Sequence, residues 1–128
     1  MTAIALDRQQ RLLLAAALHQ LANDRETAVA LDTDAAILLN DCVHSARPGY
    51  MRAFAALLTS SALEDPAMTL TTTDIAIAAA LHQLANAYEI GIPLDEQGDR
   101  LLAGIEAARD LCAKDLRRLA NRIAEIRP

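Results

Sequence analysis

The sequence predicts an all-α fold, an antiparallel helical bundle of four to five helices in one domain spanning residues 1–128. Alanine and leucine supply 28 and 21 of the 128 residues, whereas strand-favouring residues are scarce, with two valines, nine isoleucines and three aromatic side chains. An apolar fraction of 53% and a formal net charge of −5 exclude a disordered chain. A chain of this length buries a sufficient core without a disulfide or a structural metal.

An internal repeat organises the chain. Residues 15–23 read AAALHQLAN, and residues 78–86 read the same nine letters 63 positions later. Between 12–42 and 75–105, 14 of 31 positions are identical without a gap, and the similarity fades beyond that point. We interpret this pattern as a tandem-duplicated helical hairpin with pseudo-twofold symmetry, its repeats covering about 12–63 and 75–126.

Three helices are predicted in the first repeat. The first begins at Asp7, a candidate N-cap, and ends near Thr27. Two aspartates suited to a helix N-terminus open the second, which ends near Ser45 and forms the other arm of the hairpin. Pro48 begins the third helix, which ends near Leu63.

Two helices are predicted in the second repeat, and no strand is expected anywhere. The first covers about 72–90 and is closed by Gly91 and a following proline. Asp95 opens the second, which is expected to continue unbroken to about Ile126. Two hairpins of this kind would pack as an up-down-up-down bundle.

The last helix carries an apolar stripe that needs a cover. Its members recur at helical spacing and are too apolar to face water: Leu116, Leu119, Ile123 and Ile126. The helix from Pro48 can cover part of this stripe within one chain. We expect the same stripe of a second copy to cover the rest, which predicts a homodimer with these four residues at its interface.

A polar face is duplicated along with the repeat. It consists of His19, Asn23 and Glu26 in the first copy and of His82, Asn86 and Glu89 in the second. A helical wheel places both sets away from the core stripes, so both histidines are predicted to be exposed, and the six residues are candidates for binding a partner. A metal site in a bundle points inward, and the paired Glu-x-x-His motifs of di-metal bundles are absent, so neither a metal nor a cofactor is predicted.

The motifs of common catalytic sites are missing. The chain has no Gly-rich phosphate loop, and its Asp41, Cys42, His44 and Ser45 are too close along one helix to converge as nucleophile and base. Lys114, Arg118 and Arg122 form a basic row on the last helix. Acidic residues alternate with this row and no aromatic ring accompanies it, so nucleic-acid binding is not the favoured interpretation.

These patterns favour a small, non-catalytic protein-interaction module that acts as a homodimer in the cytoplasm. The N-terminus lacks the basic and apolar regions of a signal peptide, and the longest apolar run, Leu12 to Leu18, is too short to cross a membrane. Two alternatives stay open: a metal-binding or catalytic bundle that uses the duplicated His/Asn/Glu face, and a nucleic-acid-binding regulator that uses the basic row.

Overall fold

The computed structural model describes residues 4–39, 47–64, 67–70, 75–91, 94–103 and 113–124. Within these ranges the predicted all-α class is confirmed, because six helices make up the fold and the only strands form one short pair. In chain order the elements are β1 (Ile4–Asp7), α1 (Arg8–Glu26), α2 (Thr33–Leu39), α3 (Pro48–Glu64), β2 (Ala67–Leu70), α4 (Ile75–Ile90), α5 (Glu96–Ala103) and α6 (Ala113–Ala124).

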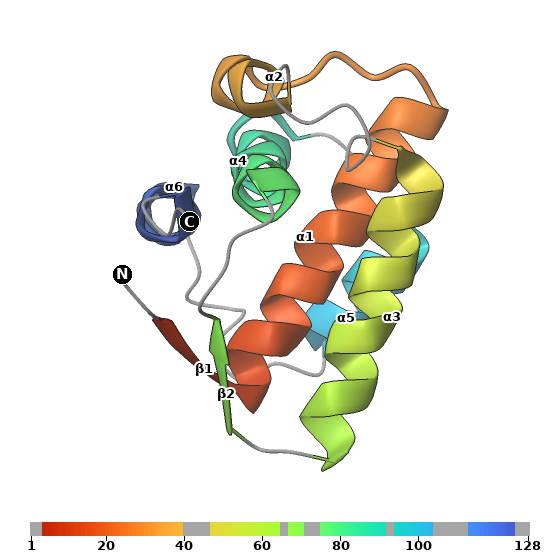
Figure 1. The fold of residues 1–128 in the computed structure, drawn as a ribbon. Helices are drawn as coiled ribbons and strands as arrows, with labels where there is room; N and C mark the ends of the chain where they lie inside the picture. Colours follow the sequence, from red (N-terminus) through yellow and green to blue (C-terminus); the bar gives the residue numbers. More distant parts are fainter. Residues whose placement is uncertain are drawn as a thin grey trace.

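The bounds of α1 and α3 and the end of α4 agree with the prediction within about one residue, whereas the single long helix to about Ile126 is wrong. The predicted start of the helix at about 72 and the predicted end near Ser45 lie outside the described residues. α5 packs on α1, and α6 packs on α4, so the two helices cover different parts of the core. Figure 1 shows α5 behind α1 and α6 on the opposite side of the molecule. Local apolar spacing is the same in one long helix and in two separate helices, which is why the sequence pattern did not distinguish them.

The helices are arranged as two crossed pairs. α1 lies antiparallel along α3, and α4 lies along α6 (Figure 1). Figure 1 shows α4 and α6 nearly end-on, whereas α1 and α3 run across the view, so the predicted up-down-up-down bundle is not the observed arrangement. The predicted hairpin of α1 with α2 is also wrong, because α2 packs across on α4 and α5 packs across on α1.

The core is built around α1 and α4, which contact each other and are each covered on further sides. Residues 13–22 of α1 and 76–85 of α4 are buried without interruption, so neither run has a side that faces solvent. The alanines that fill these runs allow close approach of the neighbouring helices. Where α5 packs on α1, a Cβ added to Gly98 would lie 3.1 Å from the carbonyl oxygen of Ala16.

The two strands correct the expectation that no strand would form. β1 and β2 pair antiparallel, with Ile4 opposite Leu70 and Asp7 opposite Ala67. Each strand is only four residues long, and a run this short gives no reliable periodicity. The pairing joins residues sixty or more positions apart, so local sequence could not specify it.

The apolar stripe of α6 is covered within one chain. Leu116 and Ile123 are 1% and 0% exposed, and Leu119 packs against the same core. Ile126 lies outside the described residues. The cover is α4 and not α3, whose Leu57 is 62% exposed, so Leu116 and Ile123 are not free for the predicted dimer contact. Among the described residues no helix is long and apolar enough to cross a membrane.

α1 and α4 are each followed by a residue with a left-handed backbone conformation. Ala28 has φ 59° and Gly91 has φ 75°. The amide of Val29 donates to the carbonyl of Asp24 over 2.8 Å, which is the long-range bond of a Schellman cap. Glycine adopts this conformation without strain, whereas alanine does not.

We therefore expect opposite effects from exchanging these two residue types. Ala28→Gly should raise the free energy of unfolding by up to about 1 kcal/mol, and Gly91→Ala should lower it by about 1 kcal/mol. A Cβ at Gly91 meets nothing within 4 Å, so the backbone alone sets the cost. Urea unfolding of both variants measures the effect, and equal signs for the two changes would contradict the cap.

Candidate functional site

The duplicated histidines are buried, which contradicts the prediction of an exposed face. His19 is 7% exposed and His82 is 4% exposed. The wheel assumed one buried side per helix, but α3 covers the His19 side of α1 and α6 covers the His82 side of α4. Asn23 and Asn86 are half-buried on the same helices. The six residues therefore do not form an open contact face.

An arginine from α3 organises the first cluster. The Arg52 guanidinium donates to Nδ1 of His19 over 2.9 Å and to Oε1 of Glu26 over 2.9 Å. It also donates to Oδ1 of Asp95 over 3.2 Å, although Asp95 lies in the segment before α5. Glu26 is half-exposed, whereas Asp95 is buried. Arg52 thus connects α1, α3 and the start of α5.

The second cluster repeats the first with an arginine from α6. Arg117 donates to Nδ1 of His82 over 3.0 Å and, through two nitrogens, to Oε1 of Glu89 over 2.6 and 2.9 Å. It contacts both carboxylate oxygens of Asp32, at 2.7 and 3.2 Å. Asp34 lies 3.6 Å from the same guanidinium and has no acidic equivalent in the first cluster.

Each cluster joins the first half of the chain (residues 4–64) to the second half (residues 67–124). Asp32 caps α2 by accepting from the amides of its second and third residues, at 3.0 and 3.3 Å, and Asp95 caps α5 in the same way, at 3.0 and 3.2 Å. The amide of Asp32 donates to Gln83 over 2.8 Å, and that of Asp95 donates to Gln20 over 2.7 Å. Each aspartate therefore serves its own half through the cap and the other half through its amide and its arginine.

Asp24 links the two clusters through the core. This fully buried carboxylate accepts from Nε2 of Gln20 over 3.0 Å and from Nε2 of Gln83 over 2.7 Å. The equivalent position in the second half is Ala87, also buried. One carboxylate bonds to both glutamines, and a second one beside it would add like-charge repulsion in a buried site.

The contacts with arginine define the tautomer and the protonation state of both histidines. Arginine only donates hydrogen bonds, so Nδ1 must be the acceptor and the proton of each neutral ring lies on Nε2. Burial lowers the pKa of His19 below 6.5, and the charge of Arg52 lowers it further against the opposing charge of Asp95. Burial is also the main reason why the pKa of His82 is lowered. Both rings are therefore held neutral.

These pKa shifts predict that mild acid destabilises the fold. Between each lowered pKa and 6.5, the unfolded chain binds more protons than the folded chain, so the free energy of unfolding falls as the pH drops through this window. Unfolding by urea at about pH 7.5 and about pH 5.5 measures the loss. His19→Gln combined with His82→Gln keeps an acceptor for each arginine and should reduce the difference, and an unchanged difference would contradict the assignment.

The ionised form of the Asp32 carboxyl group is favoured by the contacts in the second cluster. Burial alone would raise the pKa of Asp32, but hydrogen bonds from Arg117 and from the amides of α2, together with the guanidinium charge, lower it below its ordinary value. In turn, the hydrogen bonds from Arg117 to Asp32 and Glu89 raise the pKa of Arg117. The cluster is thus an ion network at neutral pH.

Metal binding has one candidate group among the described residues. Asp32, Asp34 and His82 each place a ligand atom within 4.8 Å of the others. However, Arg117 already contacts Asp32 and His82, so its positive charge occupies the position that a cation would need. The Nδ1 lone pair of His82 is engaged by the same guanidinium. These donors fit arginine better than a metal.

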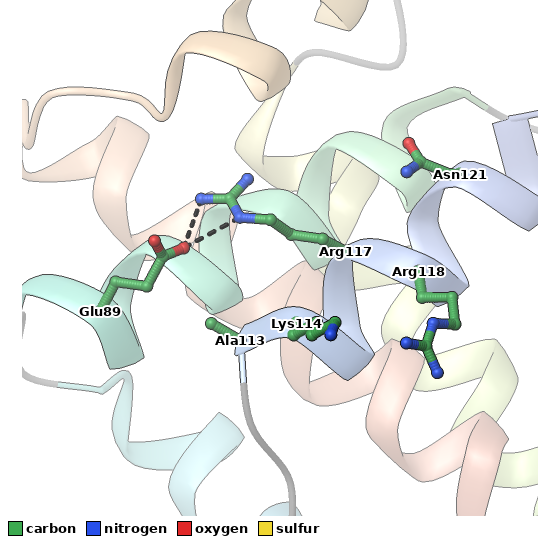
Figure 2. Close-up of a pocket in the computed structure, with 6 residues that line it drawn as sticks. All are labelled: Glu89, Ala113, Lys114, Arg117, Arg118 and Asn121. Carbon is green, nitrogen blue, oxygen red and sulfur yellow. Dashed lines mark hydrogen bonds and ion pairs between the residues drawn. The ribbon is translucent and has the colours of Figure 1, made fainter.

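A surface pocket lies next to the second cluster, between α4 and the outer side of α6. Its volume is about 480 Å³, and it is lined by Glu89, Ala113, Lys114, Arg117, Arg118 and Asn121. Figure 2 shows Arg117 extended toward Glu89, whereas Arg118 points away from it. Lys114, Arg118 and Asn121 are exposed. Lys114 and Arg118 of the predicted basic row therefore line this pocket.

Sequence reasoning missed Arg52, Arg117 and the two glutamines. The glutamines are the residues after the histidines within the repeated nine letters, and repetition of such polar residues in an otherwise apolar run was the available signal. The arginines were harder to find, because they match only when α3 and α6 are aligned 65 positions apart instead of 63.

The alignment of α3 with α6 at an offset of 65 positions can be derived from which of their residues are buried. Met51, Ala55 and Leu58 are the buried residues of α3 in the described region, and Leu116, Ala120 and Ile123 are those of α6. The two sets have the same spacing, and Arg52 and Arg117 follow their first members.

The chain matches no protein-family model, no curated protein and no solved structure.

Proposed function

We propose that the chain is a tandem duplication of one strand-helix-helix-helix unit, folded as the single-chain counterpart of a symmetric dimer, and that it functions as a non-catalytic protein-binding domain. The strand pairing supports the duplication. Ile4 and Ala67 are 63 positions apart, as are Asp7 and Leu70. The pair Ile4–Leu70 therefore maps onto the pair Ala67–Asp7 when the two halves are exchanged, as a twofold axis requires.

The exchange of contacts between the halves supports the same proposal. α2 packs on α4, and α5 packs on α1, so each half covers the central helix of the other. Arg117 of the second half binds Asp32 of the first, while Arg52 of the first half binds Asp95 of the second. Reciprocal contacts of this kind are typical of the interface in a twofold dimer.

The observation that carries the functional proposal is how the reactive side chains are used. Each arginine bonds to the buried histidine of its own half and to the aspartate cap of the other half. A general base or nucleophile needs a lone pair directed at a substrate, whereas Nδ1 of each histidine is directed at a guanidinium. These groups therefore stabilise the fold, and we infer that the protein functions through its exposed surface.

The exposed side of α6 is the proposed contact surface. Its Lys114, Arg118 and Arg122 form no ion pair with a carboxylate among the described residues, so their charges are available to a partner. The corresponding positions of α3 are Gly49, Ala53 and Leu57. Two otherwise matching helices thus present different surfaces.

Site-specific photo-crosslinking tests this function. A photoreactive amino acid placed at Arg118, and in a separate variant at Ala53, is activated in the native host. We expect a discrete protein adduct from position 118 and none from position 53, because only α6 carries the proposed surface. Adducts to nucleic acid, or the absence of a protein adduct at position 118, would contradict the proposal.

A further inference from the structure

A second pocket adjoins the one beside Arg117 along α6. The second pocket has a volume of about 380 Å³ and shares Arg117 and Asn121 with the first. It extends to Ala124 near the end of α6 and to Ile37 and Leu38 of α2. The two adjoining pockets are together called here the α6 groove.

The α6 groove has a basic end. Lys114 and Arg118 are both exposed, and none of the ion pairs in the described part of the chain involves them. The guanidinium of Arg117 is neutralised by Glu89 and Asp32, so it adds little net charge. Lys114 and Arg118 are therefore the groups that can attract an anionic side chain.

The opposite end of the α6 groove is apolar. Ile37 is 59% exposed, and Leu38 and Ala124 beside it are half-buried. His82 lies beneath with its Nε2 protonated, and Asp34 is at the rim. Burying an exposed isoleucine against an apolar side chain of a ligand would be favourable.

The two halves differ in this groove more than in the clusters beneath it. Lys114, Arg118 and Asn121 correspond to Gly49, Ala53 and Ala56 on α3. Ile37 and Asp34 correspond to Arg100 and Gln97, which removes the exposed apolar residue and the rim carboxylate. An arginine cluster thus occurs twice, whereas a basic end and an apolar end occur together only beside the second cluster.

We propose that the α6 groove binds an extended segment of a partner protein that has a carboxylate side chain at one end and an apolar side chain at the other. This inference rests on the proposed protein-binding function and specifies its ligand. Lys114 and Ala124 are ten positions apart, which is about 15 Å along a helix. An extended peptide covers this distance with about five residues, so the acidic and apolar side chains should be about that far apart in its sequence.

A peptide is favoured over nucleic acid as the occupant. Glu89 and Asp34 line the groove and would repel a phosphate backbone, and none of the described residues that line it has an aromatic ring for base stacking. The chain as a whole has a net charge of −5, which also opposes a polyanion. A single carboxylate beside Lys114 and Arg118 avoids most of this repulsion.

Selection from a library of displayed random peptides, each about twelve residues long, tests the inference on the full chain. We expect enriched peptides to share an acidic residue and an apolar residue at the stated spacing. Lys114→Glu with Arg118→Glu should weaken their binding by about tenfold or more, because it reverses the charge of the basic end. The matched control, Gly49→Glu with Ala53→Glu, adds the same charges at the corresponding positions of α3 and should leave binding unchanged.

Further measurements test the apolar end of the groove by itself and distinguish failure of the groove proposal from failure of the protein-binding function. Ile37→Ser should weaken binding of a selected peptide but not of its version with serine at the apolar position. Thermal unfolding of each variant checks that loss of binding is not loss of fold. Enriched peptides that bind equally to wild type and to the Lys114/Arg118 variant would overturn the groove while leaving the protein-binding function intact. A library without enrichment, or binding of a DNA duplex in its place, would overturn both.

Discussion

Replacing Arg117 with methionine should lower the free energy of unfolding by about 2–4 kcal/mol, because it removes the partner of a buried carboxylate. Asp32 is only 9% exposed and would keep its charge without the guanidinium that compensates it. The Nδ1 acceptor of His82 would lose its donor as well. Urea denaturation at neutral pH measures the change.

Two variants sharpen this prediction. Arg118→Met removes the adjacent arginine, which is exposed and forms no ion pair among the described residues, and should change stability by less than about 0.5 kcal/mol. Asp32→Asn in the Arg117→Met background removes the unpaired charge but keeps an oxygen to cap α2, so part of the lost stability should return. Equal losses from Arg117→Met and Arg118→Met would show that the cluster does not hold the halves together.

Ile123→Ala should cost about 2–4 kcal/mol, and Leu58→Ala should cost a similar amount at the matching position of the other half. Both side chains are buried within one chain, at 0% and 1% exposure. Each change therefore removes apolar contacts and leaves a cavity. Leu57→Ala is the control, because this neighbour of Leu58 is 62% exposed and should have an effect below about 0.5 kcal/mol.

The dependence on protein concentration decides between an intrachain core and the dimer contact expected from the stripe of α6. Burial within one chain predicts that the cost of Ile123→Ala is the same at every concentration. A cost that changes with concentration, together with a larger species in light scattering, would restore the dimer contact. The comparison with Leu58→Ala controls for a general loss of stability.

Local sequence was sufficient for much of the helical structure. α1, α3 and α4 begin and end close to the predicted positions, because apolar periodicity, proline and capping residues act within one or two turns. The repeated nine letters also identified the two helices that form the centre of the core. Even the left-handed ends at Ala28 and Gly91 are local features of helix termination.

Pairing between distant segments required the tertiary structure. Whether His19 faces water depends on α3, whose Arg52 is far along the chain, and the same is true of His82 and Arg117. A helical wheel records only the spacing within one helix, so it cannot show that a central helix is covered on several sides. The uninterrupted apolar runs from Leu12 to Leu18 and from Ile75 to Leu81 were signs of such burial in the sequence.

The sequence by itself therefore determined the all-α class, the main helices and the repetition of their chemistry. Only the tertiary structure decided that α2 and α5 cross to the other half, that β1 pairs with β2, and that the duplicated histidines are buried against arginines. The physical reason is the range of the interactions. Backbone hydrogen bonds and caps of a helix join residues a few positions apart, whereas the cover of each helix face is chosen by packing over the whole chain.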